Sequence, residues 1–251
     1  MACKLVTTIG VTSLSLLGAF APLSISFNNS HAFLPLTIGN GDARADETQA
    51  YVPPGGRSAP QRTQGSGARG CTNSIPVTLN LLAPGDHIAR TTLAHPTFLW
   101  NVSGATSAPM IFTLTAPGSQ EPIFQKQLKA DKAGIVQLEV PQTSTPLAVG
   151  QQYRWTVALV CNQKRPSQNI NARAWIERVA STPELTQKLA TANNERDRAS
   201  IYTKSGVWYD GIAILNQLQA KNPQDKQAVD SFVSLLKQVG LNKVISSTPT
   251  N

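Results

Sequence analysis

The sequence contains few of the residues from which catalytic and metal sites are built. Its 251 residues include three histidines and three cysteines, and charged side chains account for only 14% of them. Acidic side chains are the scarcer sign, with 14 Asp and Glu against 22 Lys and Arg. The motifs Cys-x-x-Cys, Gly-x-Ser-x-Gly, Gly-x-x-x-x-Gly-Lys and His-Glu-x-x-His are absent. These absences argue against zinc-finger modules, elbow-type serine hydrolases, P-loop enzymes and zinc proteases.

The remaining candidates for chemistry do not form a recognisable group. His87 and His95 are eight residues apart on either side of an expected turn. Asp86 next to His87 supplies a second possible metal ligand, but no third lies at a suitable spacing. The carboxylates along the expected strands are isolated, so spacing places no pair for glycosidase chemistry. The sequence therefore predicts no enzymatic activity, no cofactor and no metal site, and a hydrolase is the least favoured alternative.

The excess of positive charge is spread along the chain. Some basic residues lie in a Gly/Pro-rich stretch and others surround an expected hairpin: Arg57, Arg62, Arg69, Lys126, Lys129 and Lys132. They do not alternate with aromatic residues as in a nucleic-acid-binding groove, so nucleic acid is not an expected partner. We expect a solvated basic surface, with weak attraction to an anionic envelope polymer or lipid headgroup as the alternative.

Residues 1–32 have the features of a secretory signal peptide. Lys4 precedes the apolar run LVTTIGVTSLSLLGAFAPL, and the small-x-small site Ser30-His31-Ala32 follows. Thr, Ser and Gly dilute the apolar run, which makes it a poor membrane span. Cleavage after Ala45 and an uncleaved anchor are the less favoured alternatives. No later segment approaches transmembrane length, so the sequence predicts a periplasmic, secreted or envelope protein, whose net charge falls from +8 to +7 when Lys4 is removed.

Composition and periodicity divide the rest of the chain into four parts. Residues 33–70 are rich in Gly, Pro and Arg and are expected to form a disordered linker. Residues 71–180 are expected to form a β-sandwich domain and residues 181–241 a helical region, with a flexible tail over 242–251. The sandwich is expected to hold about seven antiparallel strands, over 77–82, 97–102, 109–115, 123–129, 134–140, 153–161 and 169–179.

Two stretches within this region resemble immunoglobulin-like and fibronectin type III sandwiches. AHPTFLWNV places Phe98 and Trp100 on one face at period two, as in an inner strand with a core tryptophan. PLAVGQQYRWTVALVC places Tyr153 after a Leu-x-x-Gly turn, like a tyrosine corner, with Trp155 following on the same face. The resemblance concerns the fold and says nothing about function.

After Pro183 the apolar period changes to that of helices. Helices are expected over 184–192, from Asn194 to Gly206, over 208–220 and over 225–239. In the middle pair, Ala199, Tyr202 and Gly211 follow the spacing of one tetratricopeptide-like helical hairpin, with Gly211 where alanine is usual. One such hairpin cannot bury its own faces, so it is expected to dock on the sandwich or to be capped by the flanking helices.

The aromatic residues supply the candidate partner contacts. Trp208, Tyr209 and Asp210 are expected to start the third helix and to line a packing seam, with the carboxylate favoured by the helix dipole. Only the outward edge of Trp208 or Tyr209 is then free to contact a partner. Trp175, in NARAWIERV, is the candidate for stacking on sugar rings together with Tyr51 or Trp208, although core or interdomain packing is the favoured interpretation.

Residues 70–241 resemble a cyanobacterial family, domain of unknown function 928. The matching features are the linker ending RGC, HPTFLW, LAVGQQYRW–ALVC, AWIERV and IYTKSGVWYDGIAIL–LLKQVGL. The resemblance implies an exported, non-enzymatic envelope protein, with gene neighbours that suggest a role associated with secretion, and it supplies no catalytic residue. The expected function is therefore binding of an unknown envelope protein. The alternative is a carbohydrate- or peptidoglycan-binding module that uses exposed aromatic residues.

Export also leads to a prediction about the cysteines. Cys3 leaves with the signal peptide, and Cys71 and Cys161 form an even pair in an oxidising compartment, which favours a disulfide over two unpaired thiols. Closing a loop of this size is expected to stabilise the fold by roughly 4–5 kcal/mol. Mass spectrometry of a non-reduced digest of the exported protein should find one peptide pair joined through Cys71 and Cys161, and free thiols at both would contradict the prediction.

Overall fold

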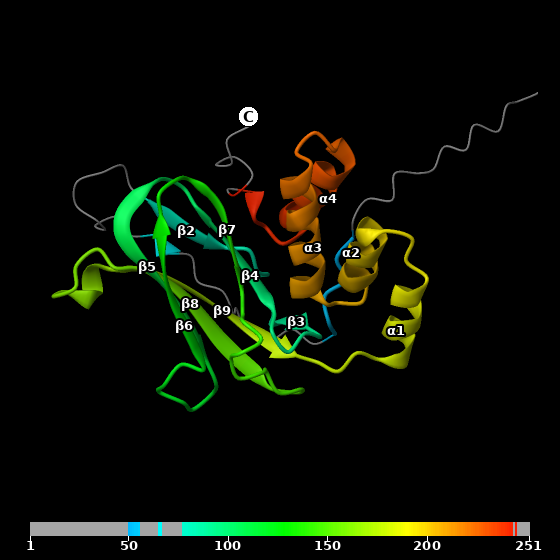
Figure 1. Ribbon diagram of the computed structural model, residues 1–251, viewed down its shortest axis with the longest axis horizontal. Helices are drawn as coiled ribbons and strands as arrows, with labels where there is room; N and C mark the ends of the chain where they lie inside the picture. The colour runs from blue at the N-terminus through cyan, green and yellow to red at the C-terminus, as the bar shows by residue number, and fades with distance from the viewer. Residues whose placement is uncertain (1–49, 56–64, 67–76, 243, 245–251) are drawn as a thin grey trace, which may run out of the picture. The chain divides into compact units, whose positions relative to one another are not determined.

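A computed structural model describes residues 50–55, 65–66, 77–242 and 244, which all lie in one compact unit, Asp46–Asn251 (Figure 1). The expected signal peptide and Cys71 lie outside the described residues. The strands are β1 (Gly65–Ser66), β2 (Thr78–Leu81), β3 (Ala89–Thr91), β4 (Thr97–Val102), β5 (Thr106–Thr115), β6 (Phe124–Ala130), β7 (Gly134–Glu139), β8 (Gln152–Leu159) and β9 (Ile170–Arg178). The helices are a 3₁₀ turn at Pro166–Gln168, then α1 (Pro183–Ala190), α2 (Glu195–Lys204), α3 (Trp208–Lys221) and α4 (Lys226–Gln238).

The described strands form two sheets, with orders β1-β2-β4-β7 and β3-β9-β8-β5-β6. Each of the seven expected strands corresponds to an observed strand with ends that differ by at most three residues. The sandwich-like architecture followed by four helices is thus confirmed at this level. The expectation of a purely antiparallel sandwich is wrong, because β3 pairs in parallel with β9. This short strand was missed because three residues carry too little periodicity to indicate a strand.

Alternation of side chains explains the core between the sheets. On β8 the buried positions are Tyr153, Trp155, Val157 and Leu159, and the positions between them face outward. Trp100 and Trp155 are fully buried, which confirms their expected place in the core. The hydroxyl of Tyr153 accepts a hydrogen bond from the backbone N–H of Ala148 at 2.8 Å, the tie that the tyrosine-corner pattern predicts.

Helix α3 packs against the outer face of the four-stranded sheet at β4 (Figure 1). Every residue of β4 is buried, including Leu99 and Asn101, which point away from the other sheet. The side-chain amide of Asn216 on α3 donates to the Gln137 side chain on β7 at 2.8 Å. Apolar residues of α3 and α4 therefore belong to the same hydrophobic core as the sandwich. The helical region docks on the sandwich and is not a separate domain. Among the described residues, no helix is both long and apolar enough to span a membrane.

The first turn of α3 fastens the helices to the sandwich. The Trp208 indole N–H donates to the carbonyl of Leu82 at 2.9 Å. The Tyr209 hydroxyl accepts from the Trp155 indole N–H at 2.8 Å and donates to the carbonyl of Trp175 at 3.1 Å. Three strands or their loops are thus tied to two neighbouring helix residues.

Residues 50–55 correct the expectation that the whole of 33–70 is disordered. Tyr51 is buried, and its ring packs edge-on against Trp208 with centroids 5.0 Å apart. The Val52 N–H donates to the carbonyl of Thr203 at 3.1 Å, so the segment crosses the turn between α2 and α3. Gly206 in that turn has a φ of 77°, and a Cβ there would lie 3.2 Å from the Val52 carbonyl oxygen. Sequence composition missed this contact because Tyr51 stands alone in a polar stretch.

Local signals set the ends of the helices as expected. Asn194 caps α2 by accepting from the Asp197 N–H at 2.9 Å, and the Asp197 carboxylate accepts in return from the Asn193 N–H at 3.1 Å. Thr182 and Asp225 cap α1 and α4 through the same kind of bond. Arg196 on α2 reaches Asp225 at 3.3 Å and so joins α2 to the start of α4.

Helices α2 and α3 approach each other closely at Gly211. A Cβ at this position would lie 2.4 Å from the Thr203 Cγ2 and 3.1 Å from the Ala199 carbonyl oxygen. Thr203 is fully buried, so its methyl group cannot move into solvent. This contact explains why glycine stands where the helical-hairpin pattern predicted alanine.

We expect Gly211→Ala to destabilise the fold by about 1–3 kcal/mol, because the added methyl overpacks the α2–α3 contact. The change can be measured by urea unfolding followed by circular dichroism. Thr203→Ser removes the opposing methyl but keeps the hydroxyl that donates to the Ser200 carbonyl at 3.1 Å. The double variant should therefore lose less than the sum of the two single losses. Additive losses would contradict this account of the contact.

Candidate functional site

The outer face of the five-stranded sheet is the candidate site. Whereas α3 covers the four-stranded sheet, the outward side chains of β8 and β9 alternate with buried ones and are exposed or half-buried. Trp175 is one of them and is half-buried on β9. This placement follows from the alternation in NARAWIERV, in which Ala174 and Ile176 face the core.

Strand register arranges the outward residues in rows across the sheet. Trp175 on β9 lies directly opposite Arg154 on β8. In the next row Arg173 faces Thr156, and Thr156 faces Thr113 on β5. The outermost strand adds Gln125 opposite Thr113 and Gln127 opposite Ile111. The rows bring together residues from four strands that sequence reasoning had treated one by one.

The chemistry of this face suits a ligand rich in hydroxyl groups. A tryptophan side chain offers a large flat apolar surface, and amide and hydroxyl side chains donate and accept hydrogen bonds. Gln125, Gln127 and Asn171 are exposed, and Thr113 and Thr156 are half-buried between them. A sugar ring has both an apolar face and a rim of hydroxyl groups, so it could use both kinds of contact.

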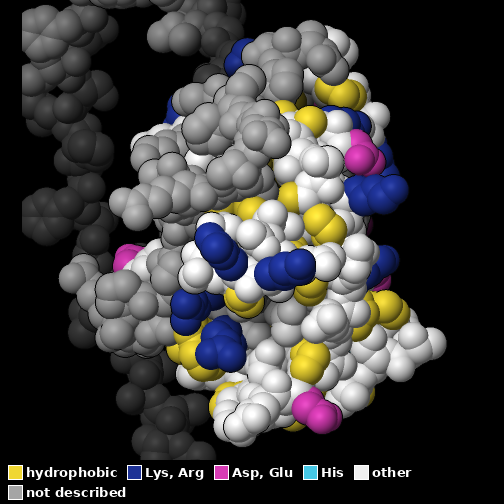
Figure 2. All heavy atoms as spheres, turned by 90° about the vertical axis from the view of Figure 1, so that its left-hand side faces the viewer, with side chains coloured by type: hydrophobic (Ala, Val, Ile, Leu, Met, Phe, Trp, Pro, Cys, Tyr) yellow, Lys and Arg dark blue, Asp and Glu magenta, His cyan; other side chains and the backbone are white. Residues whose placement is uncertain are grey.

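The charge of this face is positive. Arg154 and Arg173 are exposed near Trp175. Among the outward positions of these described strands, Glu177 is the acidic residue, and its carboxylate already binds the Arg90 guanidinium at 3.1 Å. Figure 2, which faces the side where β5, β6 and β8 lie in Figure 1, shows Lys and Arg side chains gathered together while acidic ones lie toward the margin.

The helical region holds the backbone under Trp175. The Tyr209 hydroxyl donates to the Trp175 carbonyl from the buried side of β9, while the Trp175 side chain points outward. The Trp155 indole N–H completes the contact by donating to the same hydroxyl. Tyr209 is therefore a positioning residue for the sheet at this point rather than a contact residue.

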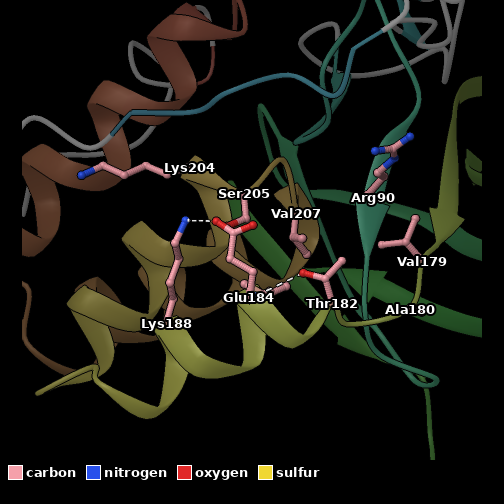
Figure 3. A pocket seen from close by; sticks show the side chains of 10 residues that line it. Arg90, Val179, Ala180, Thr182, Glu184, Lys188, Lys204, Ser205 and Val207 are labelled. Atoms are coloured by element: carbon pink, nitrogen blue, oxygen red, sulfur yellow. Dashed lines mark hydrogen bonds and ion pairs between the residues drawn. The ribbon is translucent and has the colours of Figure 1, made fainter. Parts of the chain in front are cut away.

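A groove beside α1 is the second candidate (Figure 3). Its volume is about 340 Å³, and its lining includes the basic residues Arg90, Lys188 and Lys204 and the apolar residues Leu185 and Val207. Figure 3 shows the Arg90 side chain on one side of the groove and Lys188 and Lys204 on the other.

The basic groups of this groove do not converge on one point. Glu184 lies between them in Figure 3, and Lys188 binds its carboxylate at 2.7 Å. The hydrogen bond and charge of Lys188 lower the pKa of Glu184, which stays ionised at neutral pH. Arg90 is also paired with an acid, Glu177. The groove is thus less suited to an anionic ligand than its basic residues alone suggest.

A hydrogen-bonded chain of three residues lies at a smaller cavity of about 210 Å³. The Asp86 carboxylate contacts the His87 Nδ1 at 2.7 Å, and the His87 Nε2 contacts the Tyr51 hydroxyl at 2.6 Å. Burial, followed by the charge of Asp86, raises the pKa of Tyr51, so the phenol stays protonated and is a poor nucleophile. This series of side-chain contacts anchors residues 50–55, and both ring nitrogens of His87 take part in it.

The other residues singled out in the sequence are now placed. Trp208 is 0% and Tyr209 1% exposed, so the expectation that the outward edge of one of them contacts a partner is wrong. Both rings are buried in the hydrophobic core. Cys161 is half-buried after the end of β8, and because Cys71 lies outside the described residues, their disulfide stays a prediction. In the part of the chain described, no three His, Cys, Asp or Glu residues are grouped to hold a metal ion.

Residues 64–249 match the family described as Domain of Unknown Function (DUF928). The chain belongs to this family. No curated protein matches the chain. A multi-domain immunophilin from Arabidopsis thaliana is a solved structure with some likeness, at 7% identity and a TM-score of 0.21 over 68% of this chain and 92% of that one. A score this low carries no argument about fold or function.

One buried acid accompanies the attachment of α3. Asp210 is 3% exposed, and its carboxylate accepts hydrogen bonds from the Thr91 hydroxyl at 2.5 Å and from the Thr92 N–H at 3.0 Å, besides the Thr92 hydroxyl. Burial raises the pKa of Asp210, and these hydrogen bonds only partly oppose the rise. Burial and the charge of Asp210 also raise the pKa of nearby Tyr202. Asp210 thus ties α3 to β3. Its side chain also lies in the first turn of α3, where the helix dipole favours a negative charge.

The raised pKa of Asp210 predicts a pH-dependent stability. An unfolded Asp has a pKa of about 3.9, so the folded chain holds the Asp210 proton to a higher pH than the unfolded chain does. The free energy of unfolding should therefore fall as pH rises from about 4 through the folded pKa and then level off. Asp210→Asn should lack this component. Urea unfolding of both proteins across this range gives the difference, and a difference that stays flat or rises with pH would contradict the prediction.

Proposed function

We propose that this chain is a non-enzymatic binding protein of the cell envelope that binds polysaccharide on the outer face of its five-stranded sheet. The observation that carries the proposal is the position of Trp175, which stands half-buried at an outward position of β9, beside the exposed side chains of Arg154 and Arg173. An aromatic ring that is not needed by the core is available for ligand contact. The envelope location rests on the signal-peptide features of residues 1–32.

A flat sheet face favours a polymer over a small molecule. Small-molecule sites are usually enclosed cavities lined mainly by apolar groups. The rows of Trp175, Arg173 and Asn171 instead run along β9 at successive outward positions, and each row continues across β8. Such a surface offers several contacts in line, as an extended chain of sugar units requires.

Binding of an envelope protein is the competing proposal, and it has lost part of its support. It relied on exposed aromatic edges at Trp208 and Tyr209, which are buried. The groove beside α1 is the surface left to it, with an apolar floor at Leu185 and Val207. The acid–base pairs already formed there leave less charge for a partner to complement.

The proposal of a non-enzymatic role rests on the states of the titratable groups. The Tyr51 phenol is held protonated, and the Asp210 carboxylate is engaged by Thr91 and Thr92. His87 is 5% exposed and bonded on both sides. None of these groups combines access to substrate with a free proton-transfer position, as general acid–base catalysis requires.

We expect Trp175→Ala to weaken retention on envelope polysaccharide about tenfold or more, because the stacking surface is lost. Co-sedimentation with purified peptidoglycan measures retention on the insoluble polymer. Affinity electrophoresis in gels that contain a soluble polysaccharide measures binding to soluble polymers. Trp175→Phe should keep part of it, because phenylalanine still offers a ring.

The control for this experiment is Leu93→Ala. Leu93 is also a large exposed hydrophobic residue, at 44%, but it lies in the loop after β3. The Leu93→Ala variant should bind like the wild type. Thermal unfolding should show that this variant and both Trp175 variants are folded. Equal retention of Trp175→Ala and wild type would reject the sheet face as the site. Absence of retention on every polysaccharide would reject polysaccharide binding and leave the protein-partner proposal.

A further inference from the structure

We propose that Arg154 and Arg173 bind the carboxylates of an acidic polysaccharide, so that the sheet face selects a uronic-acid type of polymer over a neutral one. The inference rests on the proposed function and names the ligand class of the same site. Its basis is the arrangement of the two guanidinium groups around Trp175. Arg154 lies across the strand pair from Trp175, and Arg173 lies two residues before it on β9.

Strand geometry puts the three side chains within reach of adjacent sugar units. Directly opposed residues of antiparallel strands have Cβ atoms about 5 Å apart. Residues two apart on one strand are separated by about 7 Å and point to the same face. A sugar stacked on Trp175 would therefore have one guanidinium beside it across the sheet and another beside it along the strand. These are the positions of substituents on the same unit or on its neighbour in the chain.

Arginine is the side chain best matched to a sugar carboxylate. Its planar guanidinium presents a fork of N–H donors that can bind both carboxylate oxygens at once. The neighbours Thr156, Thr113 and Gln125, which continue the Arg173 row, can bind neutral hydroxyl groups. The face thus separates two tasks, with the arginines for acid groups and the amides and hydroxyls for the rest of the sugar.

The charge of the surrounding face favours the same ligand. Glu177 is the acidic residue at the outward positions of the described strands of the five-stranded sheet, and Arg90 binds it at 3.1 Å. Its charge is therefore compensated, and Arg154 and Arg173 are the charged residues in the Trp175 and Arg173 rows. A polymer with carboxylates along its chain presents the opposite charge to both guanidinium groups.

The test compares two polymers with the same backbone. Polygalacturonate carries a carboxylate on each sugar, whereas its fully methyl-esterified form carries none, and dextran sulfate supplies negative charge without carboxylates. Binding of the full chain to each polymer is measured by affinity gel electrophoresis. We expect the wild type to bind polygalacturonate at least about tenfold more tightly than the ester, and more tightly than dextran sulfate at equal charge concentration.

The variants separate the arginine fork from general charge. Arg154→Gln/Arg173→Gln should lose the preference for polygalacturonate while still binding the ester. Arg154→Lys/Arg173→Lys keeps the charge without the fork and should lose most of the preference. Lys221→Gln/Lys237→Gln removes the same charge from exposed positions on or next to the helices and should keep the preference. If one of the double arginine variants fails to fold, the two corresponding single substitutions are tested in its place.

Each contrary outcome has a distinct meaning. Equal binding of acid and ester by the wild type, or an unchanged preference in the Arg→Gln variant, would overturn the inference while leaving polysaccharide binding in place. An equal loss in the Lys221/Lys237 control, or equally tight binding of dextran sulfate, would overturn it in favour of charge alone. If neither the acid nor the ester binds, and Trp175→Ala changes nothing, the proposed function itself has failed.

Discussion

The structure depends on the attachment of one helix turn to the sandwich. Trp208, Tyr209 and Asp210 are consecutive, buried, and hydrogen-bonded to different parts of the β-region. Each bond satisfies a polar group that would otherwise be buried alone, at a cost of about 1–3 kcal/mol per group. Apolar packing alone would allow α3 to slide or rotate on the sheet. The hydrogen bonds of these three residues fix its position, and through the Tyr209–Trp175 contact they also fix the backbone of β9.

That attachment determines which surfaces remain for binding. With α3 in place, Leu99 and Asn101 are covered and the outer side of β4 is closed. The aromatic side chains of Trp208 and Tyr209 are buried in the same contact. Removal of the helices would expose buried residues such as Leu99 and Asn101, so a truncated sandwich would report on its own instability rather than on a lost partner. The outer face of the other sheet carries the residues that the core does not need.

Sequence patterns anticipated the elements well and the contacts between elements poorly. Period-two alternation placed β4 and β8, and capping residues such as Asn194 placed the helix ends, because these signals are local. Helical periodicity indicates which face of α3 is apolar but not how deeply it is buried, so Trp208 and Tyr209 were expected to keep an exposed edge. The partners of Asp210 lie 118 and 119 residues away, beyond the reach of any spacing rule. The parity of NARAWIERV would have sufficed to turn Trp175 outward, whereas its neighbour Arg154 required the strand register.

The position of Trp175 links the stability of the fold to its proposed role. On one side of β9 the backbone carbonyl of Trp175 is held by Tyr209, and on the other side its ring faces outward. A ligand-binding aromatic group on a rigid strand loses little conformational entropy when it binds, because its backbone is already fixed. Glycine at position 211 serves the same end from a distance, since the close α2–α3 contact lets the first turn of α3 reach the sandwich. The helical region thus contributes to binding by preorganising the sheet rather than by touching the ligand.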